Sequence, residues 1–354
     1  MKLVCHIGTP KTGSTYLQGT FQQNRDWFLE RGIIYPDLLS PLANHITLFY
    51  AAATYLDPSA VAYGLHSMEE VAAFRARLVE HIRAQIDAAP PHAHTMLFSS
   101  ENLTGNLGRH DVLNLAEMLR PLFDEVEIVI YLRRQDDAVL SMYGEFMRRG
   151  YNNQTFDAFL QGATARPAVP HFLQYRVLLE FWLEAFGKDA IRVLLFDRAQ
   201  MVGGDVLTDF LTRIFDITDT AGLALPAEDN RSLSAPAQEF LRRIQPFVPF
   251  YQGNSINPAR QLLEARINQL PDRPRPYMSR AQSERVLERY RQGNEWVRQT
   301  FLPHHPAPLF PARPELGETS NIGVISLQDF AYLSAFMLTE GKVAAVAPAP
   351  NVEA

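Results

Sequence analysis

Cysteine is almost absent from this sequence, since Cys5 is the only one in 354 residues. A single cysteine cannot form a disulfide framework within the chain, so we expect a reducing compartment. Long apolar runs are also missing, because no stretch approaches the roughly 20 apolar residues that a membrane span requires. The first apolar stretch is too short for a secretion signal. We therefore expect a cytoplasmic protein without an integral membrane segment.

A strong charge of one sign is missing too. The formal net charge is −6, with 33 basic and 39 acidic residues, which gives no general attraction to nucleic acid. Clusters with metal-ligand spacing are likewise absent, because the histidines of "PHAH" and "PHHP" lie in proline-rich connectors, and we expect no metal. The remaining composition, 47% apolar and 20% charged, is typical of a globular protein with a large core.

Short apolar runs rich in β-branched residues alternate with helical patterns, which is typical of βαβ units around a parallel sheet. Strands are expected at 3–7, 95–99, 126–132 and 191–196, with helices near 69–88, 136–147 and 172–186. The sequence therefore predicts an α/β fold, a three-layer parallel sheet of P-loop type flanked by helices, with a C-terminal helical cover.

Strand patterns stop after about residue 216, and helical patterns lie at 203–215, 234–245, 258–269 and 279–292. We expect four consecutive parts: an α/β core over 1–216, a helical part over 217–300 that completes the same domain, a proline-rich connector with a C-terminal helix over 301–345, and a disordered tail over 346–354.

The stretch "HIGTPKTGSTYLQ" joins the first strand to a helix. Gly8 and Gly13 have the spacing of the glycines in G-x4-G-K-[ST], but Ser14 stands where the lysine would be and Lys11 comes earlier. Backbone N–H groups of such a turn and the helix start bind anions, and Ser14 and Thr15 add hydroxyl groups. This pattern favours a phosphate site over a plain strand-to-helix turn.

The strand at 95–99 is followed by Ser100 and Glu101. A carboxylate at this place loosely imitates the metal-holding aspartate of nucleotide hydrolases and kinases. An ATP-dependent small-molecule kinase therefore remains an alternative function.

A second motif, "VIYLRRQDDAVLSMY", has Arg133 at a strand end and Ser141 eight residues later. Together with "GTPKTGST" it resembles the sulfotransferases that use 3′-phosphoadenosine 5′-phosphosulfate (PAPS), in particular the bacterial carbohydrate type. In that family, PK-[TS]-G-[TS]-[TS] binds the 5′-phosphosulfate and R-x7-S binds the 3′-phosphate. The resemblance covers roughly residues 2 to 200 and implies that the 1–216 core binds PAPS as co-substrate and releases adenosine 3′,5′-bisphosphate (PAP), without a metal.

The resemblance implies roles for individual residues. Lys11 matches the catalytic lysine near the oxygen that bridges phosphorus and sulfur. The donor-binding set comprises Pro10, Lys11, Thr12, Gly13, Ser14 and Thr15 for the 5′-phosphosulfate, Arg133 and Ser141 for the 3′-phosphate, Tyr175 against the adenine, and Arg231 and Ser232 in a returning loop. Tyr175 fits a buried core position equally well. The family's R-K-G signature is absent after residue 216, which leaves the later part of the donor site open.

Transfer to a hydroxyl acceptor also needs a general base. The strand at 95–99 resembles the family's strand that delivers a catalytic residue near the sulfur, which makes Glu101 a candidate. His45 in "SPLANHITLFY" is the rival, as base or as substrate ligand, because histidine titrates near neutral pH.

The acceptor is predicted from "EFMRRGYNN", which carries Arg148, Arg149 and Tyr151. Aromatic and charged groups suit a carbohydrate or glycolipid hydroxyl, although a solvated helix end explains the same residues. A non-catalytic binder of phosphoadenosine nucleotides is a further alternative.

Overall fold

The computed structural model describes residues 1–151, 153–165, 171–226, 232–252, 255–267, 269–270 and 274–339. The chain forms two compact units. Unit 1 consists of Met1–Arg134, Pro170–Ala227 and Tyr290–Phe310, and unit 2 consists of Gln135–Val169, Glu228–Arg289 and Pro311–Ala354. The units therefore interleave along the chain, whereas the sequence analysis expects consecutive parts, and that assignment of parts stays a prediction.

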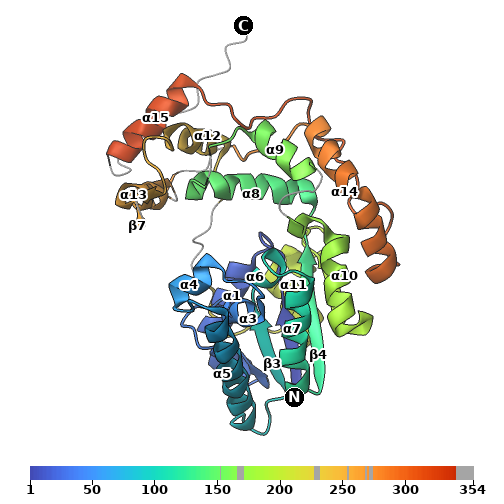
Figure 1. The fold of residues 1–354 in the computed structure, drawn as a ribbon. Coiled ribbons are helices and arrows are strands. Elements are labelled where there is room, and N and C mark those ends of the chain that lie inside the picture. The colour runs from blue at the N-terminus through green and yellow to red at the C-terminus, as the bar shows by residue number, and fades with distance from the viewer. Residues whose placement is uncertain are drawn as a thin grey trace. The chain divides into compact units, whose positions relative to one another are not determined.

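Unit 1 contains an all-parallel sheet. Its strands, among the described residues, are β1 (Lys2–His6), β2 (Ile33–Ile34), β3 (Thr95–Ser99), β4 (Glu125–Leu132) and β5 (Ile191–Leu195), in the order β2-β3-β1-β4-β5. Figure 1 shows β3 and β4 running in the same direction, with the amino terminus near their starts. A parallel sheet flanked by helices confirms the predicted α/β class.

The central strand β1 pairs with β3 from Lys2↔Thr95 to His6↔Ser99 and with β4 from Lys2↔Glu125 to His6↔Val129. Its middle residues are fully buried, as expected for a strand covered on both faces. Because the strands are parallel, the segments that follow β1, β3 and β4 emerge at one edge of the sheet, with the β1 segment in the middle. Ligands of open α/β sheets bind at this carboxyl edge.

Helices cover both faces of the sheet. In unit 1 these are α1 (Ser14–Gln23), α2 (Arg25–Leu29), α3 (Thr47–Ala52), α4 (Pro58–Tyr63), α5 (Met68–Asp87), α6 (Asn102–Gly105), α7 (Arg109–Leu119), α10 (Tyr175–Phe186) and α11 (Val206–Phe215). The helix α5 begins one residue before the predicted start, because the Ser67 side chain accepts a hydrogen bond from the Glu70 N–H and caps it.

One face of the sheet packs against α1, α2 and α11. Val4, Leu97 and Val129 point into this core from the three central strands, and Phe21 and Phe210 meet them from the helices. Residues that alternate with these point to the other face, where Phe98 contacts Phe123. The helices α3, α5, α7 and α10 contact one another in series there. The core thus fixes the start of α1 relative to the strand ends.

Unit 2 contains α8 (Gln135–Arg149), α9 (Phe156–Thr164), α12 (Ala235–Ile244), α13 (Pro258–Ile267) and α15 (Leu327–Leu338), while the residues of α14 (Arg280–Phe301) divide between the units. The sequence analysis expects no strand after residue 216, and this is wrong. Two short strands, β6 (Tyr251–Gln252) and β7 (Ser255–Ile256), pair antiparallel. Strands of two residues are too short to produce an alternating pattern. None of the described helices is long and apolar enough to cross a membrane.

Candidate functional site

The predicted phosphate loop, residues 7–13, continues the hydrogen-bond ladder of the sheet. The Ile7 N–H donates to the Val129 carbonyl at 2.9 Å, the Thr9 N–H donates to the Tyr131 carbonyl at 3.1 Å, and the Tyr131 N–H donates to the Gly8 carbonyl at 2.7 Å. The first part of the loop is therefore held as firmly as a strand. It then turns at the carboxyl edge and enters α1.

The turn depends on backbone conformations that few side chains adopt. Lys11 has φ 68° and Gly13 has φ 80°, both left-handed, and Gly13 is the residue that precedes the first turn of α1. A Cβ at Gly13 would lie 3.0 Å from Cγ1 of Val206. Alternating left-handed conformations turn successive N–H groups to one side, which forms an anion-binding concavity.

The hydroxyl groups of the loop have different surroundings. Ser14 is 5% exposed, and its Oγ has no hydrogen-bond partner among the described residues. Thr15 is exposed beside it in the first turn of α1, where N–H groups have no helical carbonyl to bond. Thr12 is fully buried and donates to the Thr9 carbonyl at 2.6 Å, so it shapes the loop from inside. Pro10 is half-buried and Lys11 is exposed.

Arg133 follows β4 and anchors the loop from one side. Its Nη1 donates to the Lys11 carbonyl at 2.7 Å, and its guanidinium lies 5.5 Å from the centroid of the Phe196 ring. The hydroxyl of Tyr175, on α10, donates to the Arg133 carbonyl. Tyr175 is 2% exposed, which agrees with the core position considered for it. Its contact with adenine stays a prediction.

Glu101 lies on the other side of the loop, after β3. A Cβ at Gly8 would lie 3.0 Å from Cβ of Glu101, so loop and glutamate are in close contact. The neighbouring Thr104 Oγ1 donates to the Ile7 carbonyl at 2.9 Å, which ties α6 to the loop. Gln18 of α1 donates to Oε2 of Glu101 at 2.7 Å. The structure thus brings the phosphate loop, Arg133 and Glu101 together at one edge of the sheet.

His45 is buried beneath this edge, at 2% exposure. Its Nδ1 accepts from the Ser99 N–H at 3.1 Å and its Nε2 lies 3.0 Å from the Pro36 carbonyl, while its ring stacks on Tyr35. Since one nitrogen accepts and the other faces a carbonyl, the ring is neutral with its proton on Nε2. Burial lowers the His45 pKa to about 3. These contacts bind the segment before α3 to the end of β3.

The other predicted residues lie in unit 2 or outside the described residues. Ser141 is half-buried on α8, and Ser232 is exposed. Arg149 pairs with Glu145 at 3.0 Å, Arg148 is half-buried, and Tyr151 is 57% exposed. Arg231 lies outside the described residues, as does the predicted tail. The pairing of Ser141 with Arg133 stays a prediction.

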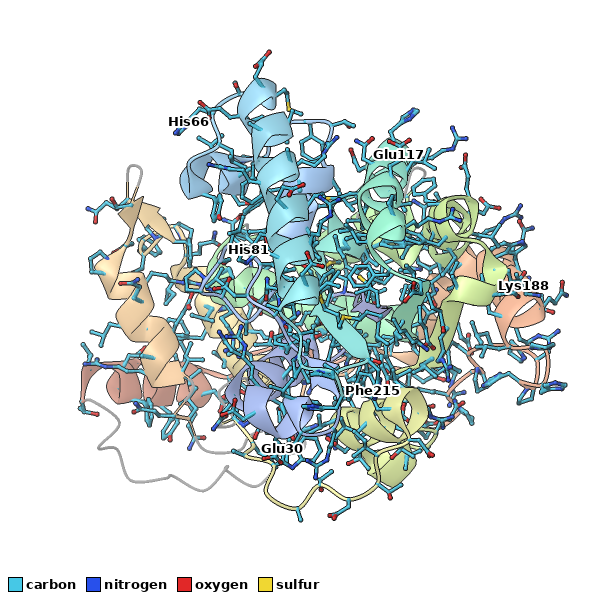
Figure 2. All side chains as sticks on the ribbon, turned by 90° about the horizontal axis from the view of Figure 1, so that it is seen from below. Glu30, His66, His81, Glu117, Lys188 and Phe215 are labelled. Carbon is cyan, nitrogen blue, oxygen red and sulfur yellow. The ribbon has the colours of Figure 1, made fainter. Side chains whose placement is uncertain are left out.

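A separate cavity lies at the opposite edge of the sheet. It has a volume of about 310 Å³ and is lined by the first residues of three strands, Lys2, Ile33 and Thr95, and by Phe215 of α11. Figure 2 looks at the chain from this side and labels Phe215. The cavity is therefore distinct from the carboxyl edge where the predicted residues meet.

The comparisons with known proteins give one structural likeness. A crystal structure described as a sulfotransferase from Alicyclobacillus acidocaldarius matches with a TM-score of 0.43 and 13% sequence identity, over 86% of this chain and 96% of that chain. No protein-family model and no curated protein matches. A likeness this distant carries no argument about chemistry, so function has to be argued from the site.

The sequence analysis does not single out Gln18, Thr104 or Arg133's contact with the loop backbone. Gln18 follows Ser14 by one helical turn, and residues four apart share a helix face. That spacing places Gln18 on the side of Ser14 and was a usable signal. Thr104 and the Arg133 contact depend on tertiary packing, for which a single sequence gives no pattern.

We predict that Gly13→Ala disrupts the site whereas Gly19→Ala does not. Alanine at φ 80° costs about 1–2 kcal/mol, and its Cβ would press against Val206. Gly19 sits inside α1, where a Cβ would meet Pro226 at an ordinary 3.6 Å, so alanine there should stabilise by up to about 1 kcal/mol. Urea unfolding of both variants measures the difference, and equal effects would contradict the prediction.

We also predict that His45 makes folding sensitive to acid. Its pKa is lowered from 6.5 to about 3 on folding, so the unfolded chain binds one more proton between these values and stability falls as pH falls through this window. His45→Gln should reduce the slope of unfolding free energy against pH by up to about 1.4 kcal/mol per pH unit. Other titrating groups contribute alike to the wild-type protein and the variant. Identical slopes in the two proteins would refute the lowered pKa of His45.

Proposed function

We propose that this protein is a sulfotransferase that moves the sulfuryl group of PAPS to an acceptor hydroxyl. The observation that carries the proposal is the contact between two chemically matched parts: the left-handed loop from Gly8 to Gly13, and Glu101 packed against it. The loop offers N–H groups, hydroxyls and Lys11 to an anionic donor. Glu101 offers a base beside it.

The donor would lie with its 5′-phosphosulfate over the start of α1. Ser14 supplies a hydroxyl that has no partner among the described residues, and Thr15 supplies an exposed one. Lys11 is exposed at the top of the turn, where a cation stabilises charge that develops on the departing phosphate. Arg133 fixes the Lys11 backbone, and we propose that it also favours the 3′-phosphate, together with Ser141. Pro10 and Thr12 shape the loop.

The reaction is an in-line displacement at sulfur. The acceptor oxygen forms a new bond to sulfur while the bond from sulfur to the oxygen of the 5′-phosphate breaks, and PAP leaves. The acceptor proton passes to Glu101, acting as general base. A carboxylate has about four lone-pair sites, so the hydrogen bond from Gln18 to Oε2 leaves capacity to accept that proton. No metal takes part in the proposed step.

We assign the base to Glu101 rather than to His45. A base must keep a lone pair directed at the acceptor, whereas the Nδ1 lone pair of His45 is used by the Ser99 N–H and the ring is 2% exposed. In this proposal His45 positions the end of β3, from which Glu101 follows. It neither takes the proton nor binds substrate.

We propose a carbohydrate or glycolipid hydroxyl as the acceptor class. The support comes from unit 2, where the 57% exposed Tyr151 lies edge-on to Phe146 at 5.6 Å and Phe250 at 6.1 Å. Exposed aromatic rings suit the apolar faces of sugars. Arg148 and Arg149 are the last two residues of α8, and their positive charges suit an acidic glycan. Tyr175, Ser232 and Arg231 remain proposed donor contacts.

We predict that, without magnesium, PAP binds more tightly than ADP or ATP. Calorimetry of the full chain measures this preference, and equal or tighter ATP binding, especially with magnesium restored, would favour the kinase instead.

Arg133→Ala should weaken PAP binding about tenfold to a hundredfold, the worth of a charged hydrogen bond. If Arg133 contacts the 3′-phosphate, the variant also loses the preference over ADP; if it only anchors the loop, both nucleotides weaken equally. Arg109→Ala, which removes an exposed pair with Glu184, is the matched control.

We predict that Glu101→Gln lowers sulfuryl transfer by about 10²-fold or more while PAP affinity stays unchanged, because the amide keeps the shape but accepts no proton. Transfer of labelled sulfate from PAPS to a panel of sugars measures the rate. Lys11→Ala should also abolish transfer while the protein stays folded. It serves as the reference variant for activity lost because the donor side of the site is damaged. If His45→Gln loses turnover while Glu101→Gln turns over at the normal rate, the assignment of the base is reversed. PAP binding without transfer to any acceptor would favour a non-catalytic nucleotide binder.

A further inference from the structure

A chain of buried polar side chains leads from the sheet interior to Glu101. His6, the last residue of β1, has Nδ1 at 2.8 Å from Oγ of Ser99, the last residue of β3. Gln18 of α1 donates from Nε2 to the same Oγ at 3.2 Å and to Oε2 of Glu101 at 2.7 Å. Side chains from β1, β3 and α1, together with Glu101 between β3 and α6, thus form one connected path.

The path is largely buried and almost without charge. His6 and Ser99 are fully buried, and Gln18 is 3% exposed. Burial lowers the His6 pKa to about 3, so its imidazole is neutral near pH 7. Glu101 is the one acidic member of the four. Hydrogen bonds make a buried network of this kind rigid, and they join Ser99, Gln18 and Glu101 here, whereas Nε2 of His6 has no hydrogen-bond partner among the described residues.

Gln18 is the member on which the orientation of Glu101 depends. A glutamine amide nitrogen carries two N–H donors, and here one nitrogen serves both the Ser99 hydroxyl and the Glu101 carboxylate. The Ser99 bond fixes the plane of the amide, and the second N–H then points at Oε2. Rotation of Glu101 away from the loop would leave a buried donor unpaired, which costs about 1–3 kcal/mol.

Gln18 also shares a helix face with the donor end of the site. It lies one turn after Ser14 on α1, and residues four apart are neighbours on a helix. The helix that begins at the phosphate loop therefore also holds the base.

We propose that Gln18 is a positioning residue that holds the Glu101 carboxylate in line with the donor loop, anchored through Ser99 to His6. This inference rests on the proposed function, in which Glu101 is the base. Gln18 itself touches neither donor nor acceptor in this proposal, so its effect is on the rate of transfer rather than on binding.

The test compares Gln18→Met with Gln22→Met in the full chain. Methionine keeps the length of glutamine and removes the amide. Gln22 lies one turn later on α1, where its amide donates to the Pro41 carbonyl at 3.0 Å. We expect Gln18→Met to lower kcat about tenfold or more, since small misplacements of a catalytic group cost up to about 10²-fold. KM for PAPS and acceptor and the Kd for PAP should stay within about twofold, as should all constants of Gln22→Met.

A second comparison separates positioning from a general effect on folding. In a Glu101→Gln background, Gln18→Met should cause no further loss of turnover, because the group that it positions is already gone. An additive loss would show that Gln18 acts through the fold, and would overturn the proposal. If Gln18→Met does not fold, Gln18→Asn takes its place: it keeps a buried amide but is one methylene too short to reach Oε2.

The outcomes distinguish the two proposals. Suppose that the wild-type protein transfers sulfuryl groups and that Gln18→Met, or Gln18→Asn in its place, has the same kcat. This result overturns the positioning role of Gln18 and leaves the sulfotransferase assignment intact. A wild-type chain that binds neither PAP nor PAPS and transfers no sulfuryl group overturns both.

Discussion

The candidate site depends on the backbone ladder between β1 and β4, which does not stop where β1 ends. Hydrogen bonds at Ile7, Gly8 and Thr9 carry it three residues further, into the loop. A turn held in this way keeps strained left-handed conformations at Lys11 and Gly13, because neighbouring strands determine its path. The sheet therefore supplies the rigidity that the proposed anion site needs.

Every other part of the site is tied to the same edge. Thr104 binds α6 to the Ile7 carbonyl, and His45 exchanges two hydrogen bonds with the backbone of Ser99. Arg133 and Glu101 follow the two strands that flank β1, so the sheet order alone sets them on opposite sides of the loop. The meeting of these side chains at one edge is thus a consequence of topology, because the order of the parallel strands determines where each following segment emerges.

Sequence patterns predicted the longer strands of the sheet and the turn that joins β1 to α1. The strands β1, β3, β4 and β5 have five or more residues each and are mostly apolar, so they are long enough to be recognised. The strands β2, β6 and β7 have two residues each and left no pattern. Within the site, the Gly8–Ser14 motif is local and was readable. The use of both His45 nitrogens and the reach of Gln18 depend on contacts between segments far apart in sequence, which one sequence cannot supply.

Arg133 is the second-last residue of the first stretch of unit 1, and it is held at both ends: its carbonyl by Tyr175 and its guanidinium by the Lys11 carbonyl. The chain therefore leaves unit 1 from a point that is itself part of the loop's support. Surface connections usually tolerate insertions and new termini. We expect this one not to tolerate them, because lengthening or opening the chain at Arg133 would release residues 7–13 from the Arg133 side chain. Permuted or split versions of the protein must be cut elsewhere.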